Sequence, residues 1–404
     1  MRQQGSALQF LVLMALVAML ADLGYEGMRG VAGPYLGLLG AGPAVIGFVG
    51  GLGELVGFGL RVVAGWVADR TRAWWALVFL GYGVNLVAIP GLAFTGRWEA
   101  AVALVLLERL GKAIRSPAKS TLVSHAARAL GPGKAFGLAE ALDQLGAVCG
   151  PLLVALAMWL REGSAAERMR GAFLVLAVPV LLNLLLLVVA RLRFPDPSAL
   201  EPPARPEDAP LPGAFSLYLL ASGLFAAGLA DWAFLSWHLG RSGALGELLL
   251  PVLYAGAMAV DAVAALLFGA LFDRAGLRAL ALALFLAAPA TGLVLLGEGP
   301  VWVGAGVIAW AIGMGAQESI AKAAIATLVP KERRARAYGW FFAAFGLCWW
   351  LGSWGMGALY ARSLPAVAAL SAAAQLLAIP LLLVLARRIS AGRALAAPPP
   401  APAP

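Results

Sequence analysis

The chain alternates long apolar segments with short polar links along most of its length. Each apolar segment has about 20 residues or more, which is the length a helix needs to cross the ~30 Å hydrocarbon core of a bilayer. The pattern therefore predicts an all-α polytopic membrane protein with about twelve transmembrane helices. The expected spans are 8–38, 43–68, 73–95, 98–118, 133–160, 170–192, 214–240, 245–271, 276–296, 301–327, 334–361 and 365–388.

A segment without an apolar face divides these spans into two sets of six. Residues 193–213 combine proline with charges of both signs, which predicts a cytoplasmic linker between an N-terminal bundle (1–192) and a C-terminal bundle (214–390). The end, 391–404, is low in complexity and is predicted to be disordered. Four short matches recur in order at nearly constant offsets, which indicates pseudo-symmetric halves. They pair Leu20–Asp22 with Leu229–Asp231, Gly65–Arg70 with Gly269–Arg274, Ala118–Lys119 with Ala321–Lys322, and Lys134–Gly137 with Arg336–Gly339.

Composition supports the membrane class. Hydrophobic residues make up 62% of the chain and charged residues 13%, against about 25% charged in soluble globular proteins. The net charge of +9 does not indicate a nucleic-acid partner, because most Lys and Arg lie in alternate loops and at the termini. By the positive-inside rule, both termini are expected in the cytoplasm, with the chain in the inner membrane and no cleavable signal peptide. Cys149 and Cys348 lie in spans and are interpreted as small hydrophobic residues.

Two loops carry related motifs. GWVADRTR follows the second span, and GALFDRAGLR follows the eighth. Both resemble the signature loop of the major facilitator superfamily, and with the repeat and linker the resemblance covers essentially the whole chain. It implies two bundles that rock about a site near the membrane midplane, and a cytoplasmic latch in which an Asp accepts hydrogen bonds from a helix N-terminus. The alternative is that these are simply turn residues with positive-inside charge. The matching residues are Gly65, Asp69, Arg70 and Arg72, and Gly269, Asp273, Arg274 and Arg278.

The fifth span contains DQLGAVCGP, which resembles the element that marks antiporters within this superfamily. Gly146, Gly150 and Pro151 carry the resemblance, and Gly137 matches a glycine upstream. The positions where this element often continues with two glycines are instead Val154 and Ala155. Small residues four apart also let helices approach closely, so helix packing is the alternative interpretation.

Ionisable residues inside the spans are the candidates for the site. Asp22, Glu26 and Arg29 share one helical face, although a charge at the bilayer centre costs at least ~2.5–3.5 kcal/mol. Asp22 recurs as Asp231, so we expect one carboxylate from each half near the midplane. The alternative is that each Asp only satisfies a local polar partner.

Acidic residues outnumber basic ones in the spans. We expect the pairs Glu26–Arg29, Glu54–Arg61 and Glu318–Lys322, and a carboxylate from Glu108, Glu140 or Asp143 beside Arg109. Carboxylates left unpaired can take up and release protons, and aromatic side chains can add cation–π surface. The candidate cavity residues are Asp22, Tyr25, Glu26, Arg29, Glu54, Arg61, Arg109, Glu140, Asp143, Asp231, Trp232, Tyr254, Asp261, Glu318 and Lys322.

The sequence thus predicts a monomeric, non-enzymatic secondary transporter that exports an organic cation or amphipathic small molecule in exchange for protons. No cofactor or resident metal site is expected, and the phosphate-binding pattern of ATP-driven pumps is absent. Three alternatives stay open: proton-coupled nutrient symport, export of a divalent metal through Asp22, Glu26 or Glu54 with His238, and a non-transporting receptor or scaffold. Two latch motifs argue against a scaffold, which needs no switch.

Overall fold

The computed structural model describes residues 2–130, 132–195, 213–330 and 333–396. Within these residues every regular element is helical, which confirms the predicted fold class. The N-terminal half contains α1 (Arg2–Leu38), α2 (Pro43–Thr71), α3 (Trp74–Gly91), η1 (Leu92–Phe94), α4 (Trp98–Leu130), α5 (Pro132–Trp159), α6 (Ala165–Val175) and α7 (Ala177–Arg193). The C-terminal half contains α8 (Gly213–Gly228), α9 (Trp232–Ser242), α10 (Leu249–Ala275), α11 (Leu277–Ala287), α12 (Ala290–Leu296), α13 (Pro300–Leu328), α14 (Arg334–Tyr360) and α15 (Leu364–Ala396).

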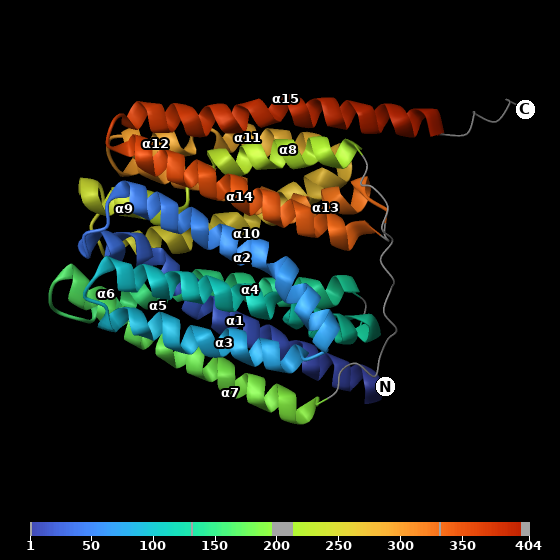
Figure 1. Cartoon of the computed structure of the whole chain (residues 1–404), viewed down its shortest axis with the longest axis horizontal. Coiled ribbons are helices and arrows are strands. Elements are labelled where there is room, and N and C mark those ends of the chain that lie inside the picture. The colour runs from blue at the N-terminus through green and yellow to red at the C-terminus, as the bar shows by residue number, and fades with distance from the viewer. Residues whose placement is uncertain (1, 131, 196–212, 331–332, 397–404) are drawn as a thin grey trace, which may run out of the picture.

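These elements make twelve passes, because four passes are interrupted. The interrupted passes are α3 with η1, α6 with α7, α8 with α9, and α11 with α12. Eleven passes in the described part of the chain are long and apolar enough to cross a bilayer. We assign α4 as the twelfth pass. This helix of 33 residues is less apolar than the others because it carries Glu108, Arg109, Lys112 and Arg115. The start of α1 and the end of α15 lie at one end of the bundle, as an even number of passes requires (Figure 1).

Two predicted boundaries are wrong. The fourth span was expected to end at 118, but α4 continues through Pro117 to Leu130. Hydroxyl groups on this turn bond to helix carbonyls: Ser116 Oγ donates to Lys112 O at 2.6 Å, which helps a helix tolerate proline inside a membrane. The C-terminal tail is helical to Ala396 rather than disordered from 391, and 397–404 lie outside the described residues, as does most of the linker.

In the described residues, the most extensive contacts between the two halves are made by three pairs of helices. α2 packs on α14, α5 on α10, and α1 on α9, and Figure 1 shows α2 lying beside α14 of the opposite half. Glycine permits the closest contacts. A Cβ at Gly47 would lie 2.3 Å from Ser353 O, and one at Gly33 would lie 2.0 Å from Ala233 O. Because these glycines lie in the parts of α1 and α2 far from the N-terminus, the bundle is closed at the end opposite the termini.

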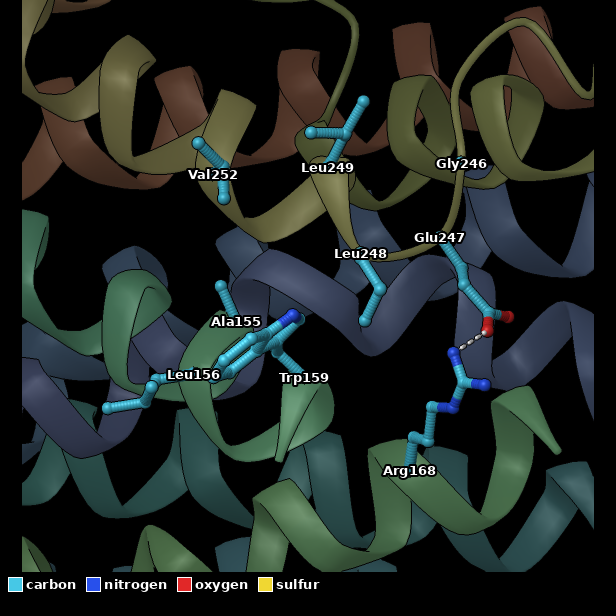
Figure 2. Close-up of a pocket in the computed structure, with 9 residues that line it drawn as sticks. All are labelled: Ala155, Leu156, Trp159, Arg168, Gly246, Glu247, Leu248, Leu249 and Val252. Atoms are coloured by element: carbon cyan, nitrogen blue, oxygen red, sulfur yellow. Dashed lines mark hydrogen bonds and ion pairs between the residues drawn. The ribbon is translucent and has the colours of Figure 1, made fainter. Parts of the chain in front are cut away.

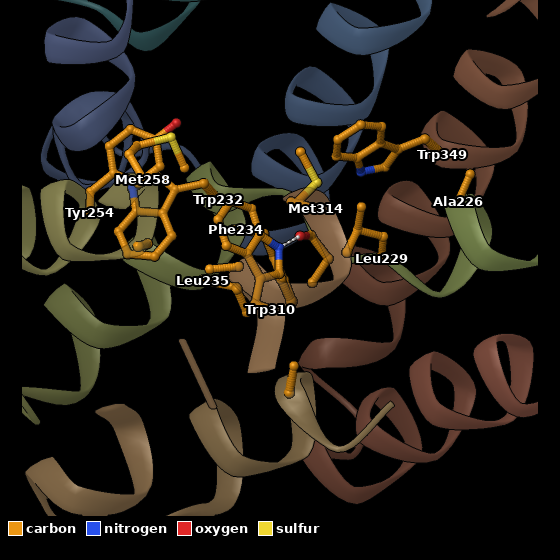
Figure 3. Packing of buried hydrophobic residues seen from close by; sticks show 14 of the residues in the cluster. Ala226, Leu229, Trp232, Phe234, Leu235, Tyr254, Met258, Trp310, Met314 and Trp349 are labelled. Atoms are coloured by element: carbon orange, nitrogen blue, oxygen red, sulfur yellow. Dashed lines mark hydrogen bonds between the residues drawn. The ribbon is translucent and has the colours of Figure 1, made fainter. Parts of the chain in front are cut away.

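Aromatic residues pack around the interruption between α8 and α9. Trp232 stacks on Tyr254 with ring centroids 4.6 Å apart and lies 5.7 Å from Trp310 (Figure 3). Trp310 Nε1 donates to Ala230 O at 2.8 Å, which satisfies a carbonyl of the interrupted segment. Because a buried carbonyl without a partner is costly, this hydrogen bond stabilises the break.

Candidate functional site

The helix break places Asp231 at the start of α9. Asp231 is the N-cap of this helix, and its Oδ1 accepts a hydrogen bond from Ala233 N at 2.8 Å. Asp is a favoured N-cap because its short side chain reaches the unpaired N–H groups of the first turn. Gly50 of α2 allows the close approach, since a Cβ there would lie 2.7 Å from Asp231 Oδ1. The second oxygen, Oδ2, faces the N-terminal half.

Arg29 connects the two halves at this point. Its Nη2 lies 2.8 Å from Glu54 Oε1 on α2 and 3.1 Å from Asp231 Oδ2 on α9. Arg29 is 8% exposed, Glu54 5% and Asp231 1%. A charge so well buried is stable only with partners, so the pairing of Arg29 with both carboxylates couples the halves electrostatically. It also explains how α1 tolerates a guanidinium near the middle of the membrane.

Arg109 of α4 joins the same group. Its Nη2 lies 3.2 Å from Glu54 Oε1, its Nη1 donates to Tyr25 OH, and Arg29 Nη1 donates to the same hydroxyl at 3.3 Å. Tyr25, Arg29, Glu54, Arg109 and Asp231 are called the central network below. In it, two guanidinium groups share Glu54 and the phenol of Tyr25, and one of them, Arg29, also pairs with Asp231.

Lys112 was outside the predicted cavity set, but its Nζ lies 3.7 Å from the centroid of the Tyr25 ring. Arg109 also lies over this ring, with Cζ at 4.8 Å. Two cations therefore occupy the π-surface of one buried tyrosine. The three-residue spacing of Arg109 and Lys112 was the available sequence signal, because such residues are neighbours on a helix.

Glu26 makes a separate contact across the seam. Its Oε2 accepts a hydrogen bond from Tyr254 OH of α10 at 2.6 Å. Trp232, stacked on Tyr254, donates through Nε1 to Gly30 O of α1 at 3.4 Å. Glu26 is partly exposed, whereas both aromatic rings are fully buried. Glu26 is thus the member of this contact that is open to solvent or ligand.

Two predicted ion pairs are wrong. Glu26 pairs with Tyr254 instead of Arg29, and Glu54 pairs with Arg29 and Arg109 instead of Arg61. Arg61 instead lies over two aromatic rings: its Cζ is 4.7 Å from the centroid of the Phe58 ring and 5.9 Å from that of Phe342. Neighbours on one helix were expected to pair, but Glu54 pairs with guanidinium groups of α1 and α4, where it is enclosed by more than one helix.

Asp22 belongs to a different group, nearer the termini. It is partly exposed on an uninterrupted helix and lies within electrostatic range of Lys119, Tyr82 and Asp143. Lys119 Nζ lies 3.5 Å from Asp143 Oδ2, so Asp143 pairs with Lys119 rather than with Arg109. Asp22 and Asp231 therefore have unlike environments, although they occupy matching positions in the repeat.

The other candidates lie apart from the central network. Glu140 is exposed, so it does not supply the carboxylate for Arg109; of the three expected partners it is Glu108 whose Oε2 lies 3.9 Å from Arg109 Nε. Asp261 is 3% exposed on α10 and lies in electrostatic contact with Glu318 of α13. The side chain of Lys322 lies outside the described residues, so the Glu318–Lys322 pair stays a prediction.

Both latch loops are exposed at the end where the termini lie. Asp69, Arg70 and Arg72 of the first loop are exposed, and Arg70 lies over Trp66 at 5.4 Å. Arg72 has φ 53° and ends α2. In the second loop Asp273, Arg274 and Arg278 are exposed, and Gly269 packs near Ser319. In the first loop, a Cβ added at Gly65 would lie 3.7 Å from Pro117 Cβ. The latch role of these residues stays a prediction.

Replacing Asp69 with Asn is expected to slow transport about two- to fivefold. In the latch interpretation Asp69 accepts hydrogen bonds from the N-terminus of a helix in the other half, and a carboxylate in such a position stabilises the contact by ~0.3–1 kcal/mol. Expression should be unchanged, since Asp69 is exposed. The measurement is the initial rate of transport in vesicles normalised to the amount of protein. A fully active variant would remove the latch interpretation.

The antiporter-like element brings α5 against α1. A Cβ at Gly146 would lie 2.3 Å from Met19 O, and one at Gly150 would lie 2.3 Å from Leu23 O. Pro151 follows at the point where α5 passes Gly30. Gly137 lies in α5 in a part whose side chains are not described. This geometry agrees with the small-residue packing interpretation; the antiporter role stays a prediction.

In the described part of the chain, no group of three or more His, Cys, Asp and Glu is arranged to hold a metal ion. His238 Nδ1 instead lies 2.7 Å from Tyr360 OH, within the C-terminal half. Cys149 and Cys348 are free thiols. The metal-export alternative therefore gains no support from this arrangement.

Comparison with known proteins decides the family. The sequence profile described as Major Facilitator Superfamily matches residues 7–352. The chain belongs to the Major Facilitator Superfamily. This superfamily member is thus a multi-pass membrane transporter. Its relatives include an uncharacterised protein of Mycobacterium tuberculosis that is 39% identical over 93% of this chain and 92% of its own length.

Solved structures share the fold of this superfamily member at low sequence identity. The peptide transporter POT in complex with sulfate has a TM-score of 0.73 at 16% identity, covering 95% of this chain and 94% of its own. A variant of the nucleoside transporter NupG has a TM-score of 0.69 at 14% identity, covering 95% and 99%. At such identities the likeness concerns the fold alone.

Proposed function

We propose that this superfamily member exports an organic cation by alternating access, in exchange for protons. The observation that carries the proposal is the contact of Arg29 with Glu54 in one half and Asp231 in the other. A carboxylate that pairs with a guanidinium can instead bind a proton or a substrate cation, but it cannot bind all three at the same time. Competition for the same carboxylates is the physical basis of exchange.

The accessible groups suggest how substrate reaches this site. Asp22, Glu26 and Lys112 are partly exposed, whereas Arg29 and Asp231 are buried beyond them, toward the closed end. A cation entering from the end of the termini would pass Asp22 and then meet Glu26. By displacing Lys112 from the Tyr25 ring, it would gain a cation–π surface that the protein now fills with its own charge.

Cation binding would then release the closed end. A cation held by these carboxylates competes with Arg29 for Asp231, which holds Arg29 across the seam, so the free energy that keeps α1 beside α9 decreases. The opposite end would close as this end opens, as expected for two rocking bundles. Protons from the side that has opened would then replace the cation on the carboxylates, so that protons and cation cross the membrane in opposite directions.

The test uses proteoliposomes with an imposed pH gradient and a lumenal pH dye. Ethidium and tetraphenylphosphonium are suitable probe cations. We expect added cation to evoke proton movement opposite to cation movement, and Lys112→Gln to change the apparent affinity for the cation. Glu162→Gln, in an exposed loop, serves as the matched control.

Two results would contradict the proposal. Cation transport without any pH response would exclude proton coupling. Cotransport of protons with a neutral or zwitterionic nutrient, with no response to the probe cations, would instead favour the symport alternative.

A further inference from the structure

A groove lies between α5 and α10 near the end of the bundle opposite the termini (Figure 2). Its volume is about 660 Å³, which is within the ~300–1,000 Å³ range of small-molecule sites. It opens on the outside of the protein rather than into the central network. The residues that line it are Ala155, Leu156, Trp159, Arg168, Gly246, Glu247, Leu248, Leu249 and Val252.

The lining is apolar and faces outward. Leu156 is 50% exposed, Trp159 70%, Leu249 52% and Val252 42%. Both α5 and α10 are membrane-spanning, so the medium that contacts these side chains is hydrocarbon. A groove in such a surface is filled by a lipid chain, because a void would forfeit dispersion contacts along its walls.

One polar pair lies at the rim of the groove. Arg168 Nη1 lies 3.1 Å from Glu247 Oε1, which joins α6 of one half to the segment before α10 of the other (Figure 2). Arg168 Nε is buried and makes no hydrogen bond in the described residues. A guanidinium with spare donors next to an apolar groove matches a phosphodiester attached to an acyl chain, because the planar fork binds phosphate in a bidentate manner.

We propose that the groove between α5 and α10 binds one phospholipid from the leaflet opposite the termini, with an acyl chain along Leu156 and Val252 and the phosphate on Arg168. The phosphate competes with Glu247 for the guanidinium. The lipid therefore exchanges one contact between the halves for a contact with the membrane. This inference does not depend on the substrate or the coupling ion.

The position of the groove connects the lipid to the transport cycle. At Gly30, α1 packs against both helices that border the groove: a Cβ there would lie 3.5 Å from Pro151 Cβ of α5 and 3.7 Å from Pro251 Cα of α10. Gly30 directly follows Arg29 of the central network. A ligand that fits only one spacing of α5 and α10 favours the conformation with that spacing. The bound lipid thus favours the state that is closed at this end.

The experiment uses the full-length protein in nanodiscs with a phosphatidylglycerol that carries a diazirine in its acyl chain. Cross-linked peptides are mapped by mass spectrometry. We expect enrichment at 155–159 and 248–252 over the lipid-facing part of α7. Val252→Trp should fill the groove and reduce this labelling roughly fivefold or more. Leu266→Trp, on an exposed part of the same helix, is the matched control.

The phosphate contact is tested separately. Arg168→Gln should reduce the labelling and Glu247→Gln should increase it, since the second change frees the guanidinium. A diazirine diacylglycerol, which lacks phosphate, should label the groove less than the phospholipid, and inorganic phosphate should not displace the phospholipid. Equal labelling by the two lipids would overturn the role of Arg168. Labelling equal to that of α7 and unchanged by Val252→Trp would overturn the lipid site.

Discussion

Replacing Asp231 with Asn is expected to abolish proton-driven transport while substrate counterflow continues. Asn keeps the shape and can still cap α9 through its amide oxygen, but it cannot exchange a proton or pair as an anion with Arg29. We expect the pH-driven rate to fall at least tenfold, equivalent to about 1.4 kcal/mol in the barrier. The measurement compares pH-driven flux with counterflow at equal pH in the same proteoliposomes.

Charge removal elsewhere should act differently. Asp22 lies outside the central network, so we expect Asp22→Asn to lower the pH-driven rate less than Asp231→Asn does. Glu26→Gln should change the preference among substrates, because Glu26 is the partly exposed carboxylate at the seam. Loss of both pH-driven flux and counterflow in Asp231→Asn, with normal yield, would mean that Asp231 binds substrate without carrying the proton. An active Asp231→Asn would remove it from the mechanism.

Replacing Gly33 with Val is expected to hold the bundle open at the end opposite the termini. A Cβ at Gly33 would lie 2.0 Å from Ala233 O and 2.8 Å from Ser236 Oγ, and the backbone of α9 cannot yield without moving. Since the clash lies between the halves rather than inside one, each half can still fold. We expect transport to fall at least tenfold, equivalent to about 1.4 kcal/mol.

Thiol labelling can report this change of conformation. Cys149→Ser and Cys348→Ser provide the background, and Ala32→Cys, at a position that is 5% exposed, provides the probe. The probe should be protected from an impermeant reagent in the parent protein and labelled in Gly33→Val. Gly83→Val is the control, because a Cβ there meets no atom within 4 Å. Normal transport and a protected probe in Gly33→Val would contradict the closed seam.

The two variants test different kinds of contact between the halves. Asp231 tests an electrostatic link across the seam, and Gly33 tests a steric one. If both variants lose net transport but only Asp231→Asn keeps counterflow, the two contacts serve separate steps. Counterflow itself requires both end states, so Gly33→Val should lose it as well.

The sequence alone determined the passes and their class. A span of about 20 apolar residues has few alternatives to a helix in a bilayer, because every backbone N–H and C=O must be paired within the segment. For the same reason the spans matched α1 to α15 within a few residues, apart from the starts of α1 and α6 and the ends of α4 and α15. The unusual charges Asp22, Glu26 and Arg29 were also visible, since any ionisable residue in such a span is conspicuous.

Only the tertiary structure decided which charges meet. The sequence favoured pairs one helical turn apart, such as Glu26 with Arg29, but Arg29 contacts Glu54 and Asp231 from two other helices. Nor did the repeat predict that α8 and α9 are separate, which makes Asp231 an N-cap and leaves Asp22 on an intact helix. The physical reason is that spacing along a chain fixes which face a residue occupies, whereas a buried charge selects its partner by the distance and enclosure that packing provides.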